Sequence, residues 1–285
     1  MIERLTASDI ANEVSMMRSA FKGTFVVVEG VTDSRLYGKF IDPEGVMVLI
    51  AHSKDNVRRS VIESRTNRRD LRIIGIMDPD LDRLNGRTYP MPLFLTDNRD
   101  QEGMILASRA LDDLLTEYAD QALLKSFEDK HGPVREAIAR SAAPIGLLMH
   151  ISRCDGLKLC FKDMDYRSFI DPRTLELDMQ RMVEEVISLS KDPNIGRKDA
   201  LSRLKRELKH LEDPWMAVRG HDAVEILTIG LAEVFGSYNS YGIKHGQVAG
   251  SLRLAFSYDY FADTGLYGDT SEWSRKTENP LWLRR

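Results

Sequence analysis

Three short apolar segments, separated by stretches of helical length, constrain the fold of this chain more than any other feature. They are rich in β-branched residues and bounded by polar or charged residues, which is typical of strands buried on both faces. The segments are Phe25–Val28, Val46–Ile50 and Leu71–Met77. Strands joined by helical crossovers lie parallel in one sheet. The sequence therefore predicts an α/β fold, a parallel sheet flanked by helices.

The remainder of the chain is expected to be mostly α-helical. We place an α/β domain in residues 1–107 and a mostly helical C-terminal domain in residues 108–285. A fourth short strand is expected at Leu93–Thr96. Further elements are expected as helices at Ile2–Phe21, Gln101–Tyr118, Val134–Ile138, Ile145–Ile151, Met179–Leu189, Lys198–Leu211 and Val224–Phe235, and as a strand at Leu157–Phe161.

Acidic residues directly follow two of the predicted strands. Glu29 comes after the first, and Asp78 and Asp80 come after the third. Because the carboxyl ends of parallel strands meet at one edge, these acids should lie together. On an extended backbone, Asp78 and Asp80 would point the same way, about 7 Å apart. Such a pair favours Mg²⁺, which one or two carboxylates commonly hold. The alternative is a simple turn, since Pro79 lies between them.

Two further acids, Asp33 and Glu102, lie at the expected starts of helices. Asp33, like Thr32, can cap the helix that follows Gly30. Glu102 either faces the same edge or, like Asp97 and Asp100, stabilises the start of a helix.

Two positively charged residues are candidates for contact with phosphate. Lys54 and Arg58 lie in Lys54–Arg72, a segment with seven basic residues and three acidic ones. The alternative is the solvated face of an amphipathic helix. In the sequence Gly-His-Asp at Gly220–Asp222, Asp222 could be a helix N-cap.

Charge and hydropathy exclude two classes of protein. The net charge of −4 argues against a protein that coats nucleic acid through bulk electrostatics. No apolar run approaches the eighteen or so residues of a membrane span, so the cytoplasm is the expected location and no membrane partner is expected.

The acidic residues after the first and third predicted strands resemble those of the Toprim domain. This domain is an α/β phosphoryl-transfer module with a glutamate after its first strand and a DxD after its third. Glu29 in VVVEGVTD and Asp78 and Asp80 in GIMDPDLD match this pattern. Asp33 matches a further metal-binding acid of the related OLD nucleases. More scattered segments, among them HSKDNV and LRLAFSYDYF, are similar to a Toprim-like family that includes the effector nuclease of PARIS anti-phage systems.

The resemblance implies a Mg²⁺-dependent endonuclease with one or two ions, for which Mn²⁺ can substitute. Residues 1–107 would be its catalytic domain, and residues 108–285 would serve substrate binding, dimer or partner contacts. Glu29, Asp78 and Asp80 would be catalytic, with Asp33 and Glu102 as further metal ligands and His221 as a contact to substrate phosphate. The substrate would be RNA such as tRNA, and a partner ATPase would hold the homodimer inactive until infection. Two alternatives stay open, namely a DNA-nicking enzyme like the OLD nucleases and a non-catalytic module that docks on an ATPase.

Overall fold

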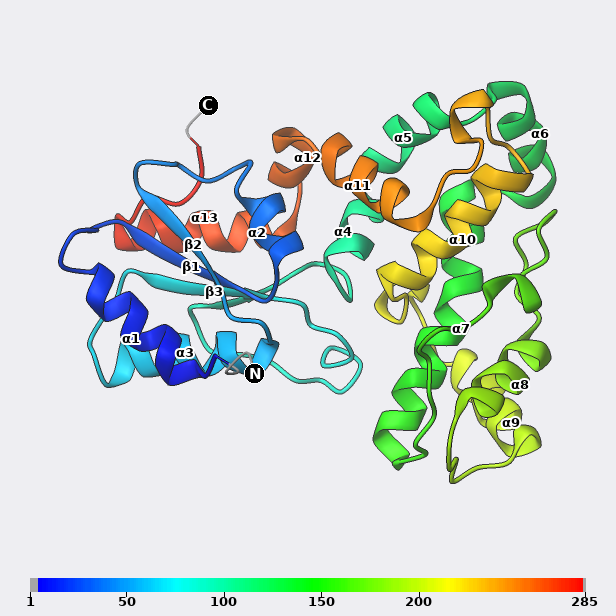
Figure 1. The fold of residues 1–285 in the computed structure, drawn as a ribbon, viewed down its shortest axis with the longest axis horizontal. Coiled ribbons are helices and arrows are strands. Elements are labelled where there is room, and N and C mark those ends of the chain that lie inside the picture. Colours follow the sequence, from blue (N-terminus) through cyan, green and yellow to red (C-terminus); the bar gives the residue numbers. More distant parts are fainter. Residues whose placement is uncertain (1–4, 284–285) are drawn as a thin grey trace. The chain divides into compact units, whose positions relative to one another are not determined.

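The computed structural model describes residues 5–283, and the chain forms two compact units (Figure 1). The first unit combines the chain up to Pro79 with Gly86–Asp97 and the chain from Ser257. The second combines Asp80–Asn85 with Asn98–Phe256. This division differs from the single expected boundary after residue 107, because the last segment of the chain returns to the unit in which the chain begins.

The first unit is built on a sheet whose strand order is β2-β1-β3-β4. Each neighbouring pair is parallel, which confirms the predicted α/β class. Every residue of β1 and β3 is buried, because both central strands are covered on their two faces. The strands are β1 (Thr24–Val28), β2 (Val46–Ile50), β3 (Ile73–Met77) and β4 (Leu93–Leu95).

One face of this sheet is covered by α1 (Ala7–Met17) and α3 (Lys54–Thr66), which lie side by side in Figure 1. Gly75 of β3 allows α3 to pack closely, since a Cβ at this position would lie 2.8 Å from a methyl group of Val57. The resulting core contains Ile10, Val14, Phe25, Val27, Val57, Val61, Ile73 and Met77.

The other face is covered by α2 (Val31–Tyr37) and by the returning C-terminal segment with α12 (Tyr258–Ala262) and α13 (Gly265–Thr277) (Figure 1). Aromatic rings join the two. Phe40 stacks on Phe261 with ring centroids 4.8 Å apart, and Trp282 packs edge-on against Phe261. These aromatic side chains therefore close a core, and this explains why the C-terminal segment belongs to the first unit.

The second unit is helical, which confirms a helical C-terminal part. Its helix α10, in which ten of fourteen residues are buried, packs against α4, α7 and α11. None of the helices within residues 5–283 combines the length and apolar character needed to cross a membrane. The unit contains α4 (Gln101–Ala107), α5 (Ala110–Tyr118), α6 (Gln121–His131), α7 (Val134–Asp155), α8 (Met179–Leu189), α9 (Arg197–Leu208), α10 (Gly220–Glu233) and α11 (His245–Ala255).

Four predicted elements differ from the structure. The helix expected from Gln101 to Tyr118 is broken at Ser108, whose backbone is extended (ψ 177°). The two helices expected around residues 134–151 are a single helix, α7, with Pro144 inside it. Residues 157–161 form no strand. The first residues of the helix expected at Ile2–Phe21, up to Arg4, lie outside the described residues.

Candidate active site

Glu29 and Asp78, which are 49 residues apart in sequence, lie in contact in the first unit. Glu29 follows β1 and Asp78 follows β3, and these strands are neighbours in the sheet. The backbone N–H of Asp78 donates a hydrogen bond of 2.9 Å to Oε1 of Glu29. Both residues are partly buried. Two carboxylates thus occupy the edge at which ligands bind in parallel α/β sheets.

A third strand adds a hydroxyl group to this edge. Thr96 follows β4 and is buried, and its hydroxyl donates a hydrogen bond of 3.3 Å to Oδ1 of Asp78. Thr96 is not among the predicted site residues. The available signal was its position as the first polar residue after the fourth parallel strand.

Asp33 acts as a helix-capping residue in the structure. Its Oδ2 accepts a hydrogen bond of 2.8 Å from the backbone N–H of Gly30, at the start of α2. This contact is the helix-capping role that the sequence predicts for Asp33. Its role as a metal ligand stays a prediction.

The strand that precedes Asp78 does not continue to Asp80. β3 ends at Met77, and Asp80 has a left-handed backbone with φ 53°. Aspartate tolerates this conformation better than most residues do. The expectation that Asp78 and Asp80 share one side of an extended backbone is therefore wrong, because the chain turns at Asp80. Within the second unit, the N–H of Asp80 donates to the carbonyl of Arg99 at 2.9 Å.

Asp100 and Glu102 begin α4 in the second unit. Asp100 is the N-cap, and it accepts hydrogen bonds of 2.8 Å from the backbone N–H groups of Gly103 and Gly220. Burial and the nearby charge of Glu102 raise the pKa of Asp100 to about 6. Oε1 of Glu102 lies 3.7 Å from a guanidinium nitrogen of Arg253. Asp100 thus stabilises the start of α4, which confirms its predicted capping role. Glu102 lies near the guanidinium group of Arg253.

Lys54 and Arg58 lie on α3 in the first unit. The ammonium group of Lys54 donates a hydrogen bond of 2.8 Å to the carbonyl of Pro79, directly after Asp78. Lys54 therefore braces the segment that carries Asp78. Arg58 pairs with Asp55 on the same helix at 2.7 Å, and both side chains are largely exposed. Arg58 therefore lies on a solvated helix face, which is the predicted alternative to a contact with phosphate.

His221 and Asp222 lie in the first turn of α10 rather than before it. The N-cap is Arg219, so the capping interpretation of Asp222 is wrong. Asp222 is instead fully buried, and its Oδ1 accepts hydrogen bonds from the Tyr166 hydroxyl at 2.5 Å and from Nε of Arg219 at 3.0 Å. Desolvation, followed by the Asp222 charge, raises the pKa of Tyr166.

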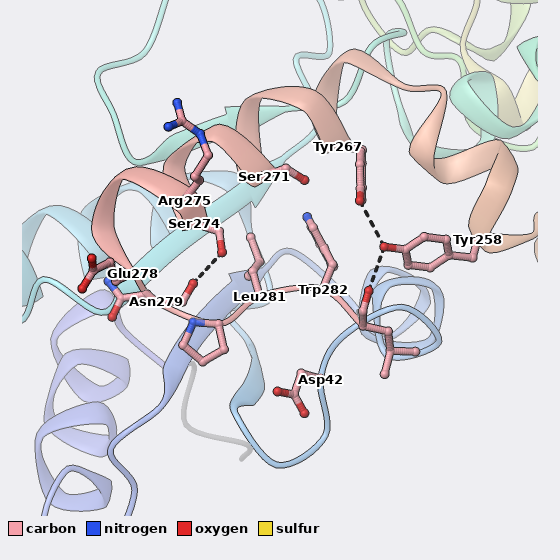
Figure 2. Close-up of a pocket in the computed structure, with 12 residues that line it drawn as sticks. Asp42, Tyr258, Tyr267, Ser271, Ser274, Arg275, Glu278, Asn279, Leu281 and Trp282 are labelled. Atoms are coloured by element: carbon pink, nitrogen blue, oxygen red, sulfur yellow. Dashed lines mark hydrogen bonds between the residues drawn. The ribbon is translucent and has the colours of Figure 1, made fainter. Parts of the chain in front are cut away.

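The first unit also contains a pocket of about 930 Å³ (Figure 2). It is lined mainly by α13 and the segment after it, where Ser274 donates to the Asn279 carbonyl at 2.6 Å. The carbonyl of Pro280, also in its wall, accepts a hydrogen bond from Thr24, the first residue of β1. The pocket is therefore at the amino end of β1, and the carboxylates follow the carboxyl end.

The predicted site residues thus divide between the two units. The first unit contains Glu29, Asp33, Lys54, Arg58 and Asp78, and the second contains Asp80, Glu102 and His221. The oxygen donors of the first unit, two carboxylates and a hydroxyl, are of the hard type that Mg²⁺ prefers.

A comparison with models of known protein families and with curated proteins finds no match to this chain.

Proposed function

We propose that the protein is a Toprim-like, Mg²⁺-dependent endonuclease that hydrolyses phosphodiester bonds in RNA such as tRNA. The observation that carries the proposal is the 2.9 Å hydrogen bond from Asp78 N–H to Glu29, which holds two acids together at the carboxyl ends of adjacent parallel strands. The positions of these acids after the first and third strands are those of the Toprim pattern. Glu29 and Asp78 are the residues that would hold the ion.

Mg²⁺ at such a site would lower the pKa of a bound water and neutralise charge on the phosphoryl group. The protein's own contribution is to hold the carboxylates in place. The Asp78 N–H orients Glu29, the Thr96 hydroxyl orients Asp78, and Lys54 anchors the carbonyl of Pro79. Preorganised groups of this kind need no rearrangement during the reaction.

The test is a cleavage assay with purified protein on tRNA and on plasmid DNA, with Mg²⁺ and with EDTA. We expect Mg²⁺-dependent tRNA cleavage that falls about 100-fold or more in Glu29→Gln and in Asp78→Asn. Glu44→Gln, which removes an exposed carboxylate outside this edge, is the matched control and should keep full activity. Asp33→Asn, Asp80→Asn and Glu102→Gln test the remaining predicted ligands in the same assay.

The outcomes separate the three interpretations of the sequence. Nicking of plasmid without tRNA cleavage would indicate an activity like that of the OLD nucleases. If wild type and Glu29→Gln behave alike on every substrate, the enzymatic proposal fails and a docking module remains.

We further propose, from the resemblance alone, that the protein is a homodimeric effector of anti-phage defence that a partner ATPase holds inactive. Light scattering of the purified protein measures its mass, and a monomer would contradict the first part. Release of toxicity in cells upon loss of a neighbouring ATPase gene would support the second part, and equal growth with and without that ATPase would contradict it.

A further inference from the structure

Two histidines and a glutamate in the second unit place their ligand atoms close together. One ligand atom each of His221, Glu225 and His245 lies within 4.8 Å of the other two. The imidazole rings of the histidines are 4.4 Å apart between centroids, and Nε2 of His221 is 4.0 Å from Oε1 of Glu225. The three side chains therefore converge on a common point.

The secondary structure explains this convergence. His221 and Glu225 are four residues apart on α10 and so lie on the same face of that helix. His245 is the first residue of α11, which packs against α10. Two ligands from one helix and one from its neighbour form a rigid support for a bound ion.

His245 carries an unusual buried nitrogen. Its Nε2 is shielded from solvent and has no hydrogen-bond partner among the described residues. Buried polar atoms without a partner are rare in folded proteins, and a bound ion is one explanation for this nitrogen.

We propose that His221, Glu225 and His245 form a zinc site with three protein ligands. Two imidazole nitrogens and a carboxylate oxygen are typical Zn²⁺ ligands, whereas Mg²⁺ prefers oxygen alone. Tetrahedral bonds of about 2.1 Å place ligand atoms about 3.4 Å apart. Nε2 of His221 and Oε1 of Glu225 are therefore close to this spacing already, and small side-chain rotations complete it.

A site with three protein ligands leaves the fourth position to water or to a ligand oxygen. The first turn of α10 is also held firmly, because Asp222, next to His221, is bonded to both Tyr166 and Arg219. These bonds hold the backbone turn that carries His221. The site rests on residues of the second unit alone and does not depend on the proposed nuclease activity.

The experiment measures zinc binding to the full chain, first stripped of metal, by competition with a chromophoric chelator. We expect one tight equivalent in the wild type and zinc affinity at least about 100-fold lower in His221→Ala, Glu225→Gln and His245→Ala. His210→Ala, at an exposed histidine, and Cys154→Ser, at an exposed thiol, are controls that should keep the equivalent. Cobalt should give the visible spectrum of a four-coordinate ion in the wild type and lose it in the ligand variants.

The proposal is overturned if the wild type binds no tight zinc, or if the equivalent persists in His221→Ala/His245→Ala. Circular dichroism checks that each variant folds. His221 is half exposed, with 51% of its side chain accessible, so His221→Ala decides the question if His245→Ala does not fold. Because the readout is metal affinity and not cleavage, inactivity of the protein on nucleic acid leaves the result unaffected.

Discussion

Replacement of Asp222 should destabilise the second unit strongly. The Asp222 carboxylate is fully buried and accepts hydrogen bonds from Tyr166 and from the guanidinium group of Arg219. Its removal leaves Arg219 partly buried without a counter-ion. Breaking a buried ion pair in this way costs about 3–5 kcal/mol, as a general rule.

The exposure of Arg219 reduces this figure. Its side chain is 28% accessible, so the guanidinium group can regain contact with water. We therefore expect Asp222→Ala to lower the free energy of unfolding by about 3 kcal/mol. Asp222→Asn keeps an acceptor for the Tyr166 hydroxyl and should cost about 2 kcal/mol. A double-mutant cycle of Tyr166→Phe with Asp222→Ala, which removes the acceptor, should show a coupling energy of about 1 kcal/mol.

Two measurements test these magnitudes. Urea denaturation gives the free energy of unfolding, and native-state hydrogen exchange of the α10 amides reports on the second unit directly. Asp199→Asn, an exposed acid in the first turn of α9, is the control and should change stability by less than about 0.5 kcal/mol. An Asp222→Ala effect as small as that of the control would refute the reasoning.

Further predictions concern Asp97, Gly75 and Lys54. Asp97 accepts hydrogen bonds from the N–H groups of Gly265 and Leu266 at the start of α13. Asp97→Ala should therefore lower the free energy of unfolding by about 1–2 kcal/mol. An unchanged midpoint of thermal unfolding would argue against this cap. Gly75→Ala should cost about 1–3 kcal/mol because of contact with Val57 and Leu93, whereas Gly268→Ala, which meets nothing within 4 Å, should not destabilise. If Lys54 contacts phosphate, Lys54→Met should reduce the slope of log affinity for nucleic acid against log salt concentration by about one counter-ion. An unchanged slope would mean that Lys54 only binds the carbonyl of Pro79.

The sequence predicted the parallel sheet well because the signal is local. Each strand is a short apolar segment buried on both faces, and each crossover has helical spacing, so neighbouring residues alone determine the pattern. The edge position of Glu29 and Asp78 follows from the same pattern, since each comes directly after a strand. Their predicted proximity required only that β1 and β3 be neighbours, which the strand order shows.

Tertiary structure decided the features that depend on distant segments. The apolar second face of the sheet needed a cover, and the rings of Phe261 and Trp282 supply it from the far end of the chain. The turn at Asp80 depends on a backbone angle that the sequence DPD does not reveal, because the same residues also suit an extended chain. The convergence of His221 and His245 arises only when α10 and α11 pack, since sequence spacing carries no information about which helices become neighbours.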